Sequence, residues 1–342
     1  MEFLKKLIAT PGVAGREERI RELILAEAAG LFDETTVDPM GNLICHKKPG
    51  KRSGKTAHKV MIAAHMDEIG FYVRAIDEEG RLRLQKVGGF EPRNLFARRV
   101  LVQGQRDLVG VMNPGIRPIH VASEEDRKKV VEVKDFFVDL FLPAKEVQKL
   151  VRVGDPVTWI QDLEVIGDVW TGKAMDDRIA IWVAINALRK AAERSPHDIY
   201  FVGTVQEEVG CRGAGPGAYG IDADIAIAVD ITLSCDTPGI EKTDAISELG
   251  KGCALKVMDS YSISDRGLLD EFIATARQRK IPHQLEILPL GGTDAGSMQR
   301  AGAGCKAFTL SIPTRYVHTP TESVHRKDVQ AGVDLLAAWL TK

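Results

Sequence analysis

The sequence predicts an α/β protein with a mixed β-sheet that is interrupted by a small inserted β-barrel-like domain. The almost wholly apolar run at residues 59–64 is typical of a strand covered on both faces, as in α/β sheets. Short alternating strands separated by Gly and Pro turns fill the chain from Gly70 to about Trp159. Helices and apolar strands alternate again after that point. We therefore predict a discontinuous α/β domain, residues 1–70 and 162–342, around an inserted β domain at residues 71–161.

Composition sets limits on the function. The chain has 342 residues, of which 44% are hydrophobic and 27% charged, so it can bury a sizeable core and fits two domains better than one. A formal net charge of -2 and a pI near 6.5 provide no basic field for nucleic acid. No apolar run approaches the roughly 18 residues that span a bilayer, and the N-terminus has no signal-peptide pattern. Five cysteines without CxxC spacing predict reduced thiols in the cytoplasm.

The elements before the insert follow from local patterns. Residues 1–8 are amphipathic, and residues 16–31 place apolar side chains at helical spacing after the turn Pro11-Gly12, so both stretches are predicted as helices. Strand-like pieces at 36–37 and 42–44 flank a turn. The apolar strand at 59–64 follows and leads directly into His65 and Asp67.

Within the insert, β-branched and aromatic residues predict strands at 71–76, 82–84, 99–102, 108–111 and 136–140, with one helix at 144–150. A helix at 176–194 and a strand at 200–205 open the second α/β segment. The remaining predicted elements are a strand at 225–229, a helix at 268–279, a strand at 285–288, a helix at 293–301, a strand at 307–312 and a helix at 328–340.

Histidines and carboxylates gather at the ends of these predicted strands. His65, the pair Glu207-Glu208 and Asp230 each follow an apolar strand, and the functional crevice of an open α/β sheet lies outside the carboxyl ends of its strands. Imidazole plus carboxylate is the ligand set for zinc and its first-row neighbours. Asp176 and His318 supply the same residue types from loops. The coincidence predicts a metal site.

Each of these residues also has a simpler explanation when taken alone. His65 fits a hydrogen-bonded core histidine, Asp176-Asp177 a helix N-cap, and Glu207-Glu208 a solvated acidic turn. Asp67, two residues after His65, points to the same face and is placed to fix the tautomer of a ligating imidazole. Cys211 lies close to the Glu pair, and a buried inert thiol is favoured there over a thiolate ligand.

Six short motifs carry a resemblance to a known family. They are AHMDEIG (64–70), GKAMDDR (172–178), TVQEEVG (204–210), AVD (228–230), GGTD (291–294) and RYVH (315–318). This series resembles that of the M42 metallo-aminopeptidases, which are tetrahedral, self-compartmentalising enzymes. The motifs occur in the family's order and cover nearly the whole chain.

The resemblance implies a dinuclear metal centre in which Asp176 bridges two divalent ions. His65 and Asp230 complete one site, Glu208 and His318 complete the other, Glu207 is the general base, and Asp67 orients His65. It also implies zinc, with cobalt or manganese as alternatives, peptide substrates, and a dodecamer built with the help of the inserted β domain.

The resemblance further places a substrate cleft beside the metals. The residues that it implies there are Gly291, Gly292, Thr293 and Asp294. Arg315 is either a substrate-binding residue that biases the pocket towards acidic side chains or the partner of a structural carboxylate.

Other functions stay open at this point. A metal-independent glycoside hydrolase would use Glu207 and Glu208 as its acid and base, but adjacent residues with opposed side chains fit the required carboxyl separation poorly. A non-catalytic peptide-binding scaffold would use the insert, for example its loop at 113–120. A deacylase or a carboxypeptidase would use a similar two-metal centre.

Overall fold

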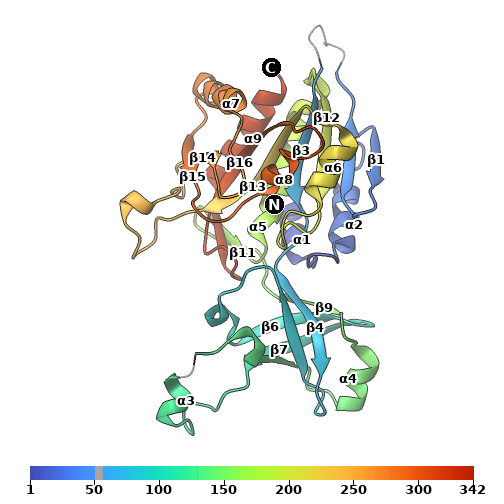
Figure 1. Cartoon of the computed structure of the whole chain (residues 1–342), viewed down its shortest axis with the longest axis vertical. Helices are drawn as coiled ribbons and strands as arrows, with labels where there is room; N and C mark the ends of the chain where they lie inside the picture. Colours follow the sequence, from blue (N-terminus) through green and yellow to red (C-terminus); the bar gives the residue numbers. More distant parts are fainter. Residues whose placement is uncertain (51–56, 129) are drawn as a thin grey trace.

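The computed structural model consists of a large α/β part and a smaller β-barrel joined at a narrow waist, and it describes residues 1–50, 57–128 and 130–342 (Figure 1). The fold class is the predicted one: a mixed α/β sheet with a closed antiparallel barrel inserted into it. Among the described residues, no helix combines the length and apolar character needed to cross a membrane.

The α/β part is built on a mixed sheet of 11 strands among the described residues. They are β1 (Glu34–Val37), β2 (Leu43–Lys47), β3 (Lys59–His65), β10 (Glu164–Ile166), β11 (Val169–Gly172), β12 (Asp198–Thr204), β13 (Ile225–Leu233), β14 (Cys253–Met258), β15 (His283–Ile287), β16 (Lys306–Arg315) and β17 (Glu322–His325). The main path runs β1-β2-β12-β3-β13-β16-β17-β11-β10, and β14 joins β15 to β16. The central strands β12, β3, β13 and β16 are parallel neighbours, so their carboxyl ends lie at one edge.

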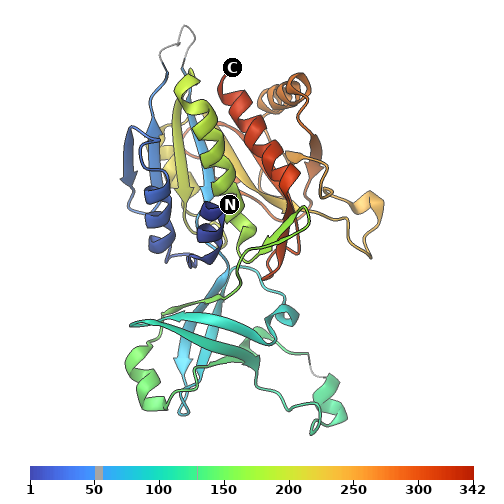
Figure 2. The same ribbon diagram turned by 180° about the vertical axis from the view of Figure 1, so that it is seen from behind.

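Helices cover both faces of this sheet. One face carries α1 (Glu2–Ala9), α2 (Glu18–Glu27), α5 (Met175–Ala191), α7 (Arg266–Arg279) and α9 (Arg326–Leu340), which Figure 2 shows in front of the strands. The other face carries α6 (Ala214–Ile221) and α8 (Asp294–Met298). The arrangement is a three-layer α/β/α sandwich.

Strand β3 is apolar from Val60 to Ala64 because its successive side chains enter two different cores. Val60, Ile62 and Ala64 pack into the core under α5 and α9. Met61 and Ala63 pack into the smaller core under α6 and α8. Side chains alternate across a strand, so a strand that is covered on both faces has no polar positions left. The expectation from residues 59–64 is confirmed.

The insert forms a closed six-stranded barrel among the described residues. Its strands are β4 (Gly70–Ile76), β5 (Leu82–Val87), β6 (Arg98–Gln103), β7 (Asp107–Pro114), β8 (Phe136–Asp139) and β9 (Pro156–Trp159), joined in the order β4-β5-β8-β7-β6-β9, with α3 (Glu124–Lys128) and α4 (Ala144–Leu150) outside. Alternate residues such as Val100 and Val102 are fully buried inside it. The barrel begins at Gly70 and ends at Trp159, close to the predicted limits of the insert.

α6 and β13 are among the elements that differ from the sequence prediction. α6 was not predicted because its sequence, AGPGAYGI, is rich in helix-breaking residues. The helix forms because its small residues allow close packing against α8: a Cβ on Gly215 would lie only 2.8 Å from Ser297 Oγ. β13 was predicted to stop before Asp230, but it continues to Leu233 because its parallel pairing with β16 continues that far.

Candidate active site

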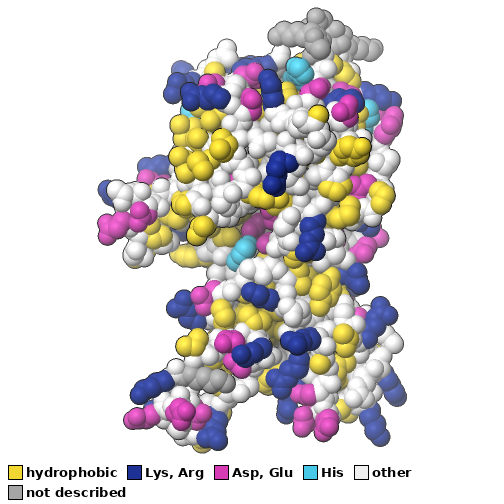
Figure 3. Space-filling view, in the orientation of Figure 1, with side chains coloured by type: hydrophobic (Ala, Val, Ile, Leu, Met, Phe, Trp, Pro, Cys, Tyr) yellow, Lys and Arg dark blue, Asp and Glu magenta, His cyan; other side chains and the backbone are white. Residues whose placement is uncertain are grey.

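The carboxyl ends of the central strands bring the predicted residues together at the waist. His65 is the last residue of β3, Glu207-Glu208 lie just beyond β12, and Asp230 lies in β13 past the point where its pairing with β3 ends at Ala228. In the space-filling view, acidic side chains and a histidine occupy the recess between the two parts of the molecule (Figure 3).

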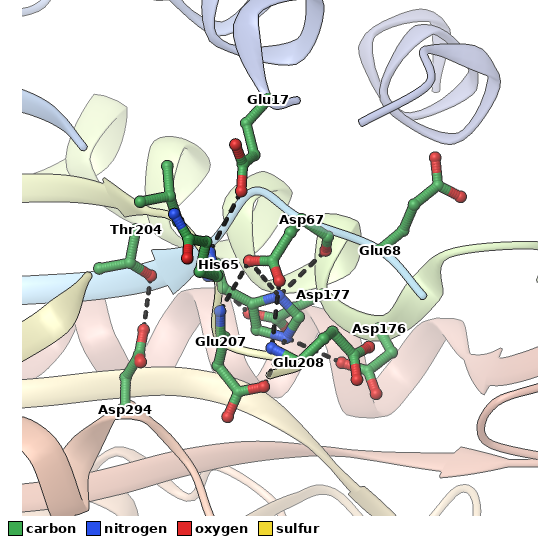
Figure 4. A network of polar contacts seen from close by, with 12 residues as sticks. Glu17, His65, Asp67, Glu68, Asp176, Asp177, Thr204, Glu207, Glu208 and Asp294 are labelled. Carbon is green, nitrogen blue, oxygen red and sulfur yellow. Dashed lines mark hydrogen bonds and ion pairs between the residues drawn. The ribbon is translucent and has the colours of Figure 1, made fainter. Parts of the chain in front are cut away.

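Asp176 stands at the centre of this cluster because its two carboxylate oxygens face two different histidines. Its Oδ1 lies 3.0 Å from His65 Nε2, and its Oδ2 lies 3.3 Å from His318 Nε2. The same His318 nitrogen lies 3.3 Å from Glu208 Oε2. Asp230 offers a ligand atom within 4.8 Å of those of His65 and Asp176. Five side chains that are far apart in the sequence therefore surround two adjoining positions that share Asp176. Figure 4 shows three of them, His65, Asp176 and Glu208.

The cluster contains more buried carboxylates than the described cations beside it can neutralise. Burial raises the pKa of Asp230, and Asp176 raises it further against the opposing charge of His65. Burial and Asp176 likewise raise the pKa of Glu208. Against the lowering effect of burial, Glu208 and Asp176 raise the pKa of His318 to about 12. Carboxylates crowded within a few ångströms of one another disfavour one another's ionised forms, and a cation held between them would relieve this repulsion, so the cluster is suited to bind cations.

Unpartnered oxygens show that the residues fit metal ions. Asp177 Oδ1, Glu208 Oε1 and Asp294 Oδ1 are buried and accept no hydrogen bond within the described residues. Buried polar atoms without a partner are rare, and a bound cation would supply the partner that these oxygens lack. Carboxylate oxygens and imidazole nitrogens are suitable ligands for zinc, cobalt and manganese.

A comparison with family models decides the relationship. Residues 41–335 match the model described as M42 glutamyl aminopeptidase. The chain belongs to the M42 family. This membership identifies the enzyme as an aminopeptidase, a hydrolase of peptide bonds.

Individual M42 relatives resemble the chain along its whole length. The lysyl aminopeptidase of Pyrococcus furiosus is 34% identical over 99% of this chain and 96% of the relative. An aminopeptidase structure from the archaeon Desulfurococcus kamchatkensis superposes with a TM-score of 0.93 at 35% identity, covering 100% and 94% of the two chains. The TET1 peptidase of Pyrococcus horikoshii, described as assembling into a tetrahedron or a large octahedral shell, has a TM-score of 0.86 at 31% identity, covering 100% and 99%.

Asp67 contacts the site differently from the sequence expectation. The hydrogen-bond partner of His65 Nδ1 is the backbone carbonyl of Asp67 at 3.0 Å, whereas the Asp67 carboxylate lies 3.6 Å from that nitrogen. The carboxylate instead accepts the backbone N–H groups of Glu207 and Glu208 at 3.0 and 3.1 Å. Asp67 therefore fixes both the imidazole ring and the turn that carries the two glutamates.

The glutamate pair lies on a turn, so strand alternation does not orient it. β12 ends at Thr204, and Gln206 has a left-handed φ of 57°, which is uncommon for a residue other than glycine. The N–H of Gln206 donates to the buried Glu17 carboxylate at 3.2 Å. Glu17 and Asp67 together support this turn from the two sides shown in Figure 4.

Glu207 faces the open side of the cluster. Its Oε2 lies 4.0 Å from His65 Nε2, and its Oε1 accepts the Cys211 thiol at 3.1 Å. Burial raises the pKa of Glu207 well above its ordinary value, and Asp230 adds to this against the charge of His65. Cys211 is itself buried, and burial raises the pKa of its thiol. A carboxylate with a raised pKa beside a metal-ligand cluster is suited to accept a proton.

The sequence did not identify two carboxylates that contact the site, Asp177 and Glu322. Asp177 is fully buried, its Oδ2 accepts the backbone N–H of His65 at 3.2 Å, and it lies within the group formed by His65, Asp176 and Asp230. Its only signal was its place beside Asp176. Glu322, on β17, accepts the backbone N–H of Asp176 at 3.0 Å and that of His318 at 2.7 Å. It follows no apolar run, so only its closeness to His318 in the sequence pointed to it.

The predicted substrate-binding residues separate into two groups. Gly291, Gly292 and Thr293 line a cavity of about 430 Å³ that opens onto the cluster, and Asp294 is buried close by, where its Oδ2 accepts the hydroxyl of Thr204 at 2.5 Å. Arg315 lies elsewhere, in a separate hollow beside β10 and β11.

Arg315 pairs with a carboxylate, which is the second of the two roles predicted for it from the sequence. Its Nε and Nη2 donate to the two carboxylate oxygens of Asp236 at 2.7 and 2.8 Å. This bidentate ion pair, together with a hydrogen bond from the Leu249 backbone N–H, lowers the pKa of Asp236 to about 2. The contacts support a structural partner and give Arg315 no place in the cavity.

Proposed function

We propose that the chain removes N-terminal residues from peptides by water activated at a dinuclear metal centre, with Glu207 as the general base. One observation carries this proposal: the two oxygens of Asp176 face His65 on one side and His318 on the other. A carboxylate in that position is suited to bridge two cations. His65 and Asp230 would complete one site, and Glu208 and His318 the other.

The residues of the chain divide the chemistry between them. Two divalent ions held there, zinc or alternatively cobalt or manganese, would lower the pKa of a shared water and polarise the scissile carbonyl. Glu207 takes the proton of the attacking water and returns it to the leaving amine. The surrounding carboxylates attract the free α-amine of a peptide, which favours cleavage at the N-terminus. Asp67 and Glu322 hold the backbone of the ligand-bearing loops in place.

We further propose that the inserted barrel serves assembly, with the domain division 1–70 and 162–342 around 71–161. The likeness to a structure described as PhTET1-12s, a dodecamer in the asymmetric unit, supports a dodecamer; its TM-score is 0.87 at 32% identity, covering 100% and 98% of the two chains. Phe141 and Val109, on the barrel, are 74% and 62% exposed. Exposed apolar side chains of this kind are suited to subunit contacts. Molar mass measured by light scattering tests the assembly, and a monomer would contradict it.

We also propose a cytoplasmic location. All five cysteines are free in the structure, which agrees with a reducing compartment.

The test of the mechanism separates metal binding from proton transfer. Glu207→Gln is expected to keep its metal content, measured by elemental analysis, and to lose about 10²- to 10⁴-fold in kcat, since general-base catalysis contributes about that much. Asp176→Ala is expected to lose bound metal as well as activity. Glu193→Gln, whose side chain is 80% exposed, is the matched surface control.

Metal removal completes this test. Dialysis against a chelator should abolish turnover, and zinc, cobalt or manganese should restore it. A Glu207→Gln enzyme with near-normal kcat, or a metal-free enzyme working at full speed, would show that the proposed mechanism is wrong.

A further inference from the structure

The cavity beside the cluster is lined by two sets of side chains. One set belongs to the cluster itself, namely Asp176, Glu207, Glu208, Asp230 and His318. The other set is apolar, and we call the part of the cavity that it lines the apolar end; its residues are Ile231, Leu233, Tyr261, Leu288, Leu290 and Val317. Ile231 and Leu288 are each 8% exposed, whereas Leu290 is 82% exposed. A substrate with its reacting bond at the cluster would place a neighbouring group against this wall.

The charged residue Lys256 does not make this end basic. Lys256 lies on β14 and lines the cavity, but its side chain is 0% exposed. Its ammonium lies 3.5 Å from Glu286 Oε1 and 3.8 Å from Asp259 Oδ2, and both carboxylates are also fully buried. The other Glu286 oxygen accepts the hydroxyl of Thr232. Two carboxylates therefore surround one ammonium, and no net positive charge is left for an acidic ligand.

The same arrangement disfavours a basic ligand. A basic side chain entering this end would meet no free carboxylate there, because Glu286 and Asp259 are fully buried and already face Lys256, and the apolar wall would strip away its water. Burying a charge without a partner is costly. Among the residues lining the cavity, none but Lys256 is a lysine or an arginine, and Arg315 is paired with Asp236 outside it.

We propose that the apolar end of the cavity receives the side chain of the substrate's N-terminal residue and selects large apolar side chains, those of leucine, methionine and phenylalanine. Leu288 and Ile231 would be the main specificity-determining contacts. This inference rests on the proposed aminopeptidase mechanism, because the scissile bond must lie at the Asp176 cluster for the N-terminal side chain to reach the wall. A volume of about 430 Å³ for the whole cavity lies within the usual range for small-ligand sites.

A panel of aminoacyl p-nitroanilides with one common leaving group tests the proposal on the metal-loaded enzyme. The leucyl, methionyl and phenylalanyl compounds should exceed the glutamyl and lysyl compounds by about 100-fold in kcat/KM. One methylene in an apolar pocket is worth about 10- to 200-fold, and a buried charge is penalised further. A glutamyl or lysyl preference would overturn the inference.

Variants of the apolar wall test which side chains determine the substrate preference. Leu288→Ala should lower the ratio of leucyl to alanyl kcat/KM by about 10-fold, since it removes contacts that only the larger side chain makes. The ratio is unaffected by the fraction of enzyme that folds. Leu285→Ala is the matched control, because Leu285 lies on the neighbouring strand β15, is 55% exposed and does not line the cavity. An unchanged ratio in Leu288→Ala would refute the assignment of this wall.

The Lys256→Met variant tests whether the Lys256 ammonium contributes to substrate selection. The proposal expects the ratio of glutamyl to leucyl kcat/KM not to fall in this variant. A glutamyl preference that disappears in Lys256→Met would overturn the proposal. If the enzyme prefers a glutamyl or lysyl substrate but Glu207→Gln loses activity as expected, only the proposed specificity is refuted. If Glu207→Gln is fully active, the proposed aminopeptidase mechanism is refuted.

Discussion

Replacing Glu68 by glutamine is expected to destabilise the folded chain by about 3 to 5 kcal/mol, the usual cost of breaking a buried ion pair by removing one partner. Glu68 Oε2 and Oε1 accept Lys173 Nζ at 2.7 and 2.9 Å, and Oε1 also accepts the backbone N–H of Gly12 at 3.1 Å. Arg178 Nη2 lies 3.7 Å from the same oxygen. Glutamine keeps the shape of the side chain but removes its charge.

The size of the effect follows from what the substitution leaves behind. The side chains of Lys173 and Arg178 are 4% and 0% exposed, so neither cation can regain water without local unfolding. Arg178 keeps two backbone acceptors, the carbonyls of Leu7 and Thr10, at 2.7 and 2.9 Å. Within the part of the chain that the structure describes, Lys173 donates hydrogen bonds to no side chain other than Glu68, and burial lowers the pKa of its ammonium, so the Lys173 ammonium loses the most stabilisation.

Denaturant unfolding of the purified protein measures the effect, with Lys173→Met and the double variant completing a cycle. The double variant should be more stable than Glu68→Gln alone, giving a coupling energy of about 1 to 3 kcal/mol. Glu79→Gln is the control, because the Arg81–Glu79 pair is exposed and its loss should change the free energy of unfolding by no more than about 0.5 kcal/mol. A loss below about 1 kcal/mol in Glu68→Gln would show that the pair does not support the fold.

Two further predictions concern the supports of the site and acid stability. Glu322→Ala removes the acceptor of the Asp176 and His318 backbone N–H groups, so it should weaken metal binding about 10- to 100-fold, measured by chelator competition, and unchanged affinity would contradict this role. Asp236→Asn should cost about 1 to 2 kcal/mol at neutral pH after allowance for screening by solvent, because the paired carboxylate has its pKa lowered from 3.8 to about 2. That stabilisation is present above pH 4 and is lost as the pH falls towards 2, so the difference from the unmodified protein in acid unfolding should shrink over that range. A difference that persists at pH 2 would refute the role of the pair with Arg315.

Site residues that directly follow an apolar run could be predicted from the sequence, because the carboxyl ends of parallel strands meet at one edge of the sheet. His65 and Asp230 lie where buried strands reach the edge of the sheet, and parallel strands bring such positions together. Their assembly with Asp176 and His318 required the family resemblance, since spacing alone does not show which loops meet. Glu322 and Asp177 could not be found in this way, because they act on backbone N–H groups that become neighbours only in the folded chain.

Tertiary contacts also explain why two elements, β14 and α6, were not predicted from the sequence. β14 was not predicted because Lys256 interrupts its apolar pattern, and that lysine is tolerated inside the protein only through Glu286 and Asp259. α6 forms despite its glycines because it packs closely against α8, where a Cβ on Gly215 would come within 2.8 Å of Ser297 Oγ. In both cases a partner distant in the sequence overrides the local preference.

The position of the barrel links assembly to the site. The chain leaves the sheet at His65 and enters the barrel at Gly70, and it returns through β10 and β11 to Asp176. The Glu68–Lys173 pair, at 2.7 Å, connects these outgoing and returning segments directly beside the site. A force applied to the barrel by neighbouring subunits would therefore reach His65 and Asp176 together and leave their separation unchanged. The same buried pair would then stabilise the fold and preserve the spacing of a bridging carboxylate and its first histidine.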